Sequence, residues 1–261
     1  WQGTIDWDAV AQTDTRFVFI RASDGTNFLD EQFYRNWAEA ERVGILRGVY
    51  QYFRPDQDVA SQAQILLERM GPMGPGVLPP VIDVEEPDAA SPSEWRRTVG
   101  EWIEIVEGAL GVRPIIYTGG YFWDGSVDSS AWAEYPLWVP HWGTDCPNLP
   151  TAWSDWVFHQ DSDSGRVSGI SGNVDTNWFN GSYEDLLNLS QGIDACSAMP
   201  AAGGTIDNGT DCFSLRGPLQ YWRTESGGFG SDYRWTNATD NESSVNAAVW
   251  RMKFERSGNL C

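Results

Sequence analysis

Short apolar runs alternate with longer amphipathic stretches through the first two thirds of the chain. Runs of four to eight apolar residues bounded by turn residues predict buried strands, and we place them at 17–20, 46–53, 81–86, 114–117, 136–139, 156–160 and 173–179. Apolar residues at helical spacing predict helices over 30–43, 59–70 and 92–110. Strands that alternate with helices predict a parallel sheet, so we expect an α/β fold. Because the last strands lack helices between them, we expect a barrel with an incomplete helical ring.

The run at 81–86 carries two acids at alternate positions, Asp83 and Glu85. In a strand both side chains would point to one face, where burial makes each charge costly. A solvated edge strand is the alternative interpretation. In barrels of parallel strands, active residues gather at the C-terminal strand ends. Residues that follow or end the predicted strands are Ser23, Asp24, Tyr52, Asp83, Glu85, Tyr117, Trp142 and Asp175.

The composition changes near residue 190. Residues 192–209 are rich in glycine and small polar residues, which is typical of a linker. Beyond it, alternating segments at 220–223, 233–236 and 249–254 predict a small all-β module. Four cysteines allow three pairings, and we prefer a disulfide between Cys196 and Cys212, which implies an oxidising compartment.

The composition of the chain excludes some classes of binding partner. The formal charge of −20 over 261 residues argues against nucleic acid and anionic membranes. No run approaches the roughly 20 apolar residues of a membrane span. The two histidines, His141 and His159, stand far apart, no metal-ligand spacing is present, and we expect no cofactor. The chain has 15 tryptophans, which serve either core packing or stacking against sugar rings.

Seven blocks of the sequence, in order, resemble the Chalaropsis-type lysozymes of glycoside hydrolase family 25. They lie at 2–7, 17–26, 48–53, 80–85, 114–119, 136–139 and 172–181. The resemblance covers residues 1–190 and implies an irregular, TIM-like (β/α)5(β)3 barrel as the catalytic domain. It also implies cleavage of the β-1,4 bond between N-acetylmuramic acid and N-acetylglucosamine in peptidoglycan glycan strands, by a secreted enzyme that we expect to be monomeric.

Carried over to this sequence, the resemblance makes Glu85 the general acid, Asp83 its partner and Asp175 the carboxylate of the last strand. A turn-forming role is the alternative for Asp175. The stereochemical outcome stays open, and one option is attack by the 2-acetamido group of the substrate, oriented by Asp83. Candidate substrate-binding residues are Tyr52, Tyr117, Trp138, Trp142 and Gln160, and for the four aromatic residues core packing is an equal alternative.

The chain departs from the family pattern in three places. The family opens with a Gly-Ile-Asp-Val-Ser strand, whereas this chain starts at Trp1, so we expect that strand and its carboxylate to be missing. Gln51 stands where the family often has histidine, and His159 and Asp161 flank Gln160 where aromatics are more frequent. Residues 191–261 hold the linker and a segment that resembles part of a golvesin-like, xanthan-lyase-type module, for which carbohydrate binding is the expected role.

Three hypotheses follow from these observations. The first is a secreted muramidase. The second is a glycan-binding protein without catalysis, because one carboxylate of the family is expected to be missing. The third is a glycosidase that acts on another N-acetylated polymer such as chitin, since one barrel can host several substrates.

Overall fold

The computed structural model describes residues 2–86 and 90–190, together with two short strands at 232–233 and 250–251. The strands are β1 (Phe17–Asp24), β2 (Phe28–Leu29), β3 (Leu46–Tyr52), β4 (Val81–Asp83), β5 (Ile115–Tyr117), β6 (Leu137–Pro140), β7 (Phe158–Gly165), β8 (Val174–Phe179), β9 (Asp232–Tyr233) and β10 (Trp250–Arg251). The helices are α1 (Trp7–Val10), α2 (Phe33–Arg42), α3 (Val59–Met70), α4 (Pro92–Leu110), α5 (Gly120–Phe122), the π-helical turn η1 (Trp123–Val127) and α6 (Tyr183–Leu189).

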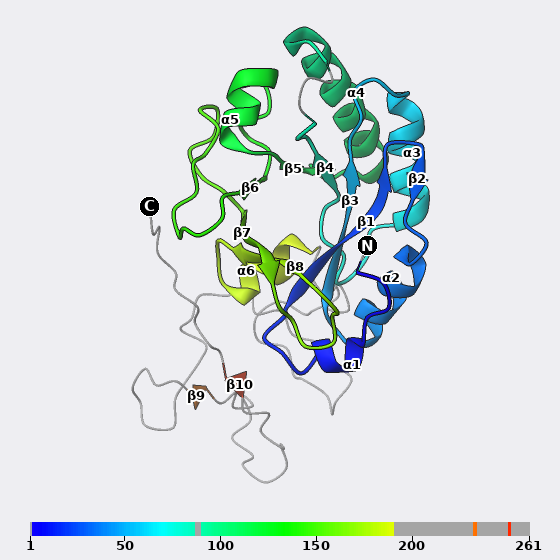
Figure 1. Ribbon diagram of the computed structural model, residues 1–261, viewed down its shortest axis with the longest axis vertical. Helices are drawn as coiled ribbons and strands as arrows, with labels where there is room; N and C mark the ends of the chain where they lie inside the picture. The colour runs from blue at the N-terminus through cyan, green and yellow to red at the C-terminus, as the bar shows by residue number, and fades with distance from the viewer. Residues whose placement is uncertain (1, 87–89, 191–231, 234–249, 252–261) are drawn as a thin grey trace, which may run out of the picture. The chain divides into compact units, whose positions relative to one another are not determined.

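The first eight strands form one sheet in the order β2-β1-β3-β4-β5-β6-β7-β8 (Figure 1). Pairing is parallel from β1 to β7, and β2 and β8 are antiparallel additions at the two ends. The sheet curls until Phe17 and Phe19 of β1 reach Phe158 of β7, with ring centroids 5.0 and 5.1 Å apart. Within the described residues β8 pairs only with β7, so the fold is a mixed α/β structure with a curled half-barrel sheet.

Helices cover the outer face of the sheet, as the amphipathic patterns predicted. In Figure 1, α2, α3 and α4 lie along one side, with α2 and α3 packed on β1 and β3, and α3 packed on α4. The predicted bounds of α3 are confirmed. For α4, the Ser91 hydroxyl accepts the Glu94 backbone N–H at 3.3 Å, and Gly111 ends the helix at a φ of 70°.

The segment after β5 departs from the predictions. We expected only strands and loops there, but α5, η1 and α6 are present. Ser182 caps α6, and Ser182 and the Asp185 side chain form the two reciprocal hydrogen bonds of a capping box. This Ser-x-x-Asp signal precedes Leu186 and Leu187 in the sequence, so the start of α6 has a local sequence signature.

The inner face of the sheet carries an apolar floor, which consists of Phe17, Phe19, Trp138 and Phe158. The Phe19 ring stacks on Trp138 at 4.5 Å. Gly48 on β3 permits this arrangement, because a Cβ there would lie 2.3 Å from two ring atoms of Phe19. The floor therefore fills the curl of the sheet beneath the C-terminal strand ends.

The chain divides into two compact units, which are Trp1–Gly192 with Gly258–Cys261, and Ile193–Ser257. Of the predicted β-module, only β9 and β10 are described, and they pair antiparallel. The predicted linker and the preferred Cys196–Cys212 disulfide lie outside the described residues. Among the helices that the structure describes, none has the length and apolar character required to cross a bilayer.

Candidate active site

Asp83 ends β4 at the C-terminal edge of the sheet. It pairs in register with Tyr52 on one side and Tyr117 on the other, so its side chain points to the inner face with theirs. The side chain is 6% exposed, and its Oδ1 atom is buried without a hydrogen-bond partner among the described residues. A buried carboxylate oxygen of this kind is ready to accept a hydrogen bond from a ligand.

Glu85 lies two residues beyond the end of β4, which corrects the prediction that the strand extends through it. The chain stays close to the sheet there, because the Val84 backbone N–H donates to the Tyr117 carbonyl at 2.9 Å. Burial raises the pKa of the half-buried Glu85, the charges of Asp175 and Glu86 raise it further, and a hydrogen bond with the Tyr117 hydroxyl lowers it.

Asp83 and Glu85 act as an electrostatic pair. Burial raises the pKa of Asp83 well above its ordinary value and the Glu85 charge adds to this rise, while Arg21 and Arg54 lower it. Two neighbouring carboxyl groups with raised pKa values titrate together, so the pair retains a proton to higher pH than an isolated carboxyl group would. The pair therefore holds a proton that it can give to a substrate at a higher pH than an ordinary carboxyl group could.

Asp175 of β8 approaches this pair from the far end of the sheet. Its charge acts on Glu85 and also reaches Tyr50 and Tyr117. The side chain is exposed, yet partial loss of hydration raises the pKa of Asp175, and the Asp163 charge raises it further. The structure therefore brings together the three carboxyl groups predicted as catalytic. We call Asp83, Glu85, Asp175, Tyr117 and Gln160 the polar rim.

Gln160 and Trp142, two of the residues predicted to bind substrate, contact each other at the rim. The Gln160 Oε1 atom accepts hydrogen bonds from the Tyr117 hydroxyl and the Trp142 indole N–H, both at 3.1 Å. Trp142 is 54% exposed, so part of its ring is open to a ligand. Gln160 thus connects an exposed aromatic surface to the tyrosine beside Glu85.

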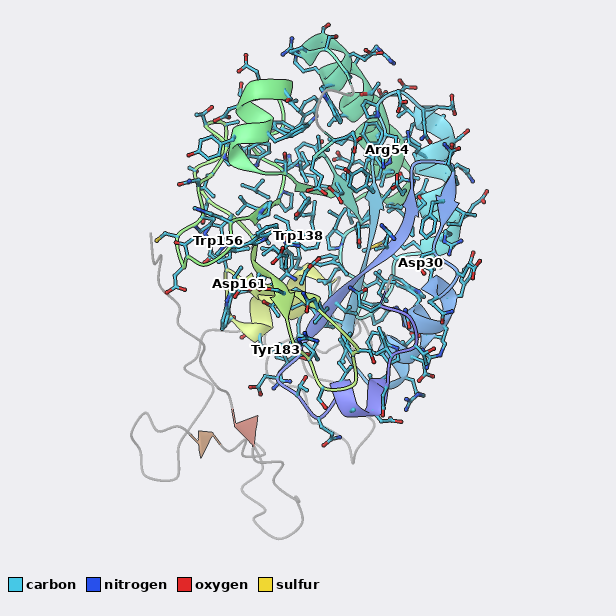
Figure 2. All side chains as sticks on the ribbon, in the orientation of Figure 1. Asp30, Arg54, Trp138, Trp156, Asp161 and Tyr183 are labelled. Carbon is cyan, nitrogen blue, oxygen red and sulfur yellow. The ribbon has the colours of Figure 1, made fainter. Side chains whose placement is uncertain are left out.

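Two other aromatic residues predicted to bind substrate, Trp138 and Tyr52, form hydrogen bonds with other side chains of the protein. Trp138 is 6% exposed, stacks on Phe19 and donates its indole N–H to Asn177 at 2.9 Å. This burial favours the core-packing alternative for Trp138, which Figure 2 labels within the curl of the sheet. The Tyr52 hydroxyl donates to Glu86 Oε2 at 2.6 Å.

Four residues near the polar rim were not among the predicted site residues. Alternation along the strand already places Tyr50 on one face with Tyr52, and Arg21 follows Phe19 at the strand period, so the same signal places Arg21 on the inner face. Arg54 and Glu86 lie outside the strands, and no periodic signal marks them. Gln51 points to the other face, where its amide donates to Ser23 and Gln62 and accepts from Trp102. Gln51 is therefore part of the sheet-to-helix packing.

Metal binding has no support in the described part of the chain, where no group of three or more His, Cys, Asp or Glu side chains is placed to hold an ion. His159 is 1% exposed, and its Nε2 atom lies 2.8 Å from the His141 carbonyl oxygen. The absence of a cofactor remains a prediction.

At the C-terminal edge of the curled sheet, the buried Asp83 and the half-buried Glu85 both have a raised pKa. A third carboxyl group, Asp175, and the exposed Trp142 accompany them. This set of side chains indicates a class of enzyme. Paired carboxyl groups of this kind are the machinery of glycoside hydrolases.

Comparisons with known proteins identify the family. The profile of glycosyl hydrolases family 25 matches residues 1–170, and the chain belongs to that family. The chain is 39% identical over 199 residues to the uncharacterized protein YegX of Escherichia coli strain K12, covering 74% of this chain and 71% of that protein. It is 35% identical over 205 residues to Lysozyme M1 of Streptomyces globisporus, covering 73% of this chain and 68% of the relative.

A solved structure agrees with this assignment. The lysozyme from Streptomyces coelicolor superimposes with a TM-score of 0.70 at 33% identity, covering 73% of this chain and 93% of the lysozyme. The protein is therefore a glycoside hydrolase, as the family resemblance predicted.

Proposed function

We propose that the protein is a lysozyme that cleaves the β-1,4 bond between N-acetylmuramic acid and N-acetylglucosamine in peptidoglycan. Glu85 is the general acid, Asp83 orients the substrate and Asp175 tunes Glu85 and positions water. Support comes from the family, from the lysozymes to which the chain is similar and from the grouping of the three carboxyl groups.

The buried Oδ1 atom of Asp83 carries the substrate assignment. An N-acetylated sugar presents an amide N–H beside its anomeric carbon, and this donor would satisfy the buried Asp83 Oδ1 atom, which has no partner among the described residues. A sugar with a plain 2-hydroxyl group lacks the neighbouring amide oxygen that could act as nucleophile. The site is therefore matched to a 2-acetamido sugar.

The chemistry then proceeds in two steps. The acetamido oxygen attacks the anomeric carbon as the glycosidic C–O bond breaks, and Glu85 gives its proton to the leaving oxygen. Asp83 accepts the amide N–H and stabilises the positive charge of the new ring. Water then opens this ring while Glu85 takes back a proton, which gives net retention at the anomeric carbon.

Trp142 provides the sugar platform beside this centre. Its half-exposed indole is anchored at one edge by Gln160, which leaves a ring face for the apolar face of a pyranose. Tyr52 and Tyr117 line the same edge of the sheet through their register with Asp83.

Muropeptide analysis of digested peptidoglycan tests the function. We expect new reducing ends on muramic acid, identified by borohydride reduction and mass spectrometry. New reducing ends on glucosamine would contradict the bond assignment. The same digest with Glu85→Gln is the matched control, because this change removes the proton and keeps the shape of the side chain.

Two alternatives are separated by the same experiment. A glycan-binding protein would pull down with insoluble peptidoglycan and release no reducing ends. A chitinase-like enzyme would release oligosaccharides from chitin at a rate equal to or above that on peptidoglycan. We favour catalysis over binding alone because Asp83 and Glu85 are both present with raised pKa values. We favour peptidoglycan over chitin because the chain belongs to family 25 and is similar to lysozymes.

We infer further properties from the sequence patterns and the family. The curled sheet belongs to a (β/α)5(β)3 barrel, in which residues 1–190 form the catalytic domain. Residues 191–261 hold a linker and part of a golvesin-like module with a Cys196–Cys212 disulfide. The enzyme is secreted, monomeric and requires no cofactor, and it binds neither nucleic acid nor membranes. Mass spectrometry of the intact protein with and without reduction tests the disulfide.

A further inference from the structure

A network of four side chains connects three strand ends beside the active site. Arg54 donates to both carboxylate oxygens of Asp24, at 2.6 Å from Nε and 2.9 Å from Nη2. Its Nη1 atom lies 2.7 Å from Glu86 Oε2, which also accepts the Tyr52 hydroxyl at 2.6 Å. The guanidinium carbon lies 4.5 Å from the centre of the Tyr52 ring. Figure 2 labels Arg54 toward the end of the sheet where β1 and β3 finish.

The network is built into the fold. Asp24 is the last residue of β1 and Tyr52 the last of β3, while Glu86 lies just beyond β4. The Arg54, Asp24 and Glu86 side chains are 26–27% exposed, so water screens their charges only in part. A bidentate guanidinium–carboxylate pair fixes direction as well as distance.

The neighbouring loop reinforces this geometry. Gln57 Oε1 accepts from the Thr26 backbone N–H at 2.7 Å and from its hydroxyl at 2.9 Å. Gly25 has a φ of 52°, and a Cβ there would lie 2.3 Å from Gln57 Oε1 and 2.8 Å from the Arg54 side chain. The two loops that follow β1 and β3 are thus held together around Arg54.

Glu86 is the direct neighbour of Glu85 in the chain. We propose that Arg54 is a positioning residue for the hydrolysis described above: it holds Glu86 against the strand ends, so that Glu85 faces the substrate, and it offsets the Glu86 charge. This inference rests on the proposed function for its kinetic consequences. Its structural part, the control of Glu85 by Arg54 through Glu86, does not.

The electrostatic interactions around Asp83 and Glu85 agree with a positioning role for Arg54. Glu86 raises the pKa of Glu85, and Arg54 lowers the pKa of Asp83. The pKa values of Asp83 and Glu85 also depend on groups from other strands, which are Arg21 and Asp24 of β1, Tyr117 of β5 and Asp175 of β8. The charges of the two acids in turn raise the pKa values of tyrosines that face them, which are Tyr50, Tyr52 and Tyr117. The Arg54–Glu86 ion pair places a positive charge directly against the chain neighbour of Glu85.

Two substitutions that each remove a charge should shift the pKa of Glu85 in opposite directions. Arg54→Gln leaves the Glu86 charge uncompensated, so the Glu85 pKa rises and the alkaline limb of kcat/KM against pH moves to higher pH. Glu86→Gln removes a negative neighbour, so the pKa falls and this limb moves to lower pH. Measured on the full chain, a loss of fold alone would lower the rate and leave both limbs in place.

Arg54→Lys separates charge from geometry. Lysine keeps the charge but lacks the planar fork, so we expect kcat to fall roughly tenfold with an unchanged pH profile. Arg97→Gln is the matched control, because Arg97 forms an exposed ion pair with Glu101 on α4 and lies outside the network. It should change neither the rate nor the profile.

Titration of the Glu85 carboxyl carbon by ¹³C NMR, without substrate, gives the same answer independently of activity. The expected result is a raised Glu85 pKa in Arg54→Gln and a lowered one in Glu86→Gln. Equal pKa values in both variants, or shifts of the same sign, would overturn the proposal. If the unaltered protein leaves peptidoglycan intact while the NMR shifts occur, the proposed function fails and the network role stands.

Discussion

The apolar floor and the polar rim lie on the same face of one sheet but differ in what they leave unsatisfied. In the floor, Phe17, Phe19, Trp138 and Phe158 pack against one another, and the indole N–H of Trp138 has a partner. In the rim, Asp83 of β4 is buried with an unpaired oxygen, and its pKa is raised mainly by that burial.

This difference separates stability from function within one face of one sheet. The floor fixes the curl of the sheet by close packing, which lowers the free energy of the folded state. The rim keeps carboxyl groups in an environment that disfavours their charges, which raises that free energy and prepares a proton donor. Substitutions in the floor should therefore lower the free energy of unfolding with little effect on kcat, whereas substitutions in the rim should lower activity with little loss of stability.

The largest expected effect on activity is in the rim. Glu85→Gln should reduce kcat by about 10²–10⁴-fold, because the amide cannot supply the proton for the leaving oxygen. The measurement is release of reducing ends from purified cell walls, with far-UV circular dichroism to check folding. Turnover close to that of the unaltered protein would remove Glu85 from the acid role.

The largest expected effect on stability is in the floor. Phe158→Ala should lower the free energy of unfolding by about 3–5 kcal/mol, because it leaves a cavity among Phe17, Phe19 and Trp138. Urea unfolding followed by tryptophan fluorescence measures the change. Below the unfolding transition, kcat should stay within about threefold of the original value, and a collapse of kcat there would break the separation of the two layers.

A smaller effect is expected at the exposed edge of the rim. Trp142→Ala should raise KM roughly five- to tenfold with little change in kcat, since a stacking platform binds substrate and transition state alike. Trp178→Ala is the matched control, because Trp178 is 53% exposed but alternates with the inward-facing Asn177 on β8. Equal effects of the two changes would place the substrate elsewhere.

The smallest expected effect is a gain in stability. The folded-state pKa of Asp83 is raised, so between about pH 4 and that pKa the folded protein binds more protons than the unfolded chain. The free energy of unfolding therefore falls as the pH rises through this window. Asp83→Asn removes the penalty and should stabilise the protein above the window by an amount on the order of 1 kcal/mol, or about 2–4 °C.

Thermal unfolding at pH 4 and pH 8 checks this expectation. The gain should be present at pH 8 and small at pH 4, where Asp83 is protonated in the folded state and only about half ionised in the unfolded chain. A loss of stability at pH 8 would mean that the carboxylate is stabilising, and the contrast between floor and rim would then fail at its central residue.

Much of the fold followed from periodicity. The α3 bounds and both ends of α4 were predicted because their caps and apolar spacing are local signals. Two predictions of elements were wrong. The strand predicted to reach residue 86 ends at Asp83, and the backbone pairing described between there and Glu86 comes from the Val84 N–H. The helix α6 was not predicted, although a capping box begins it. The curl of the sheet depends on contacts between β1 and β7, which no local pattern encodes.

The candidate site was predicted in its acids and less well in its surroundings. Asp83 and Glu85 stand out because two carboxyl groups in an apolar run are costly. The strand pattern places Asp175 at the same edge of the sheet, and the family resemblance gives it a catalytic role. Arg54 and Glu86 could not be found, because a charged residue in a polar loop has the same pattern whether it is solvated or paired. Trp138 and Trp142 look alike in sequence, and only burial distinguishes them.

Gly48 has a consequence for the evolution of this enzyme. A single added methyl group there would collide with Phe19, which in turn rests on Trp138, the neighbour of Tyr117. An added methyl group at position 48 would thus displace Phe19, and the contacts of Phe19 with Trp138 and of Trp138 with Tyr117 would carry the displacement toward Glu85. Selection at that position would therefore act on the geometry of the site as well as on the packing of the floor.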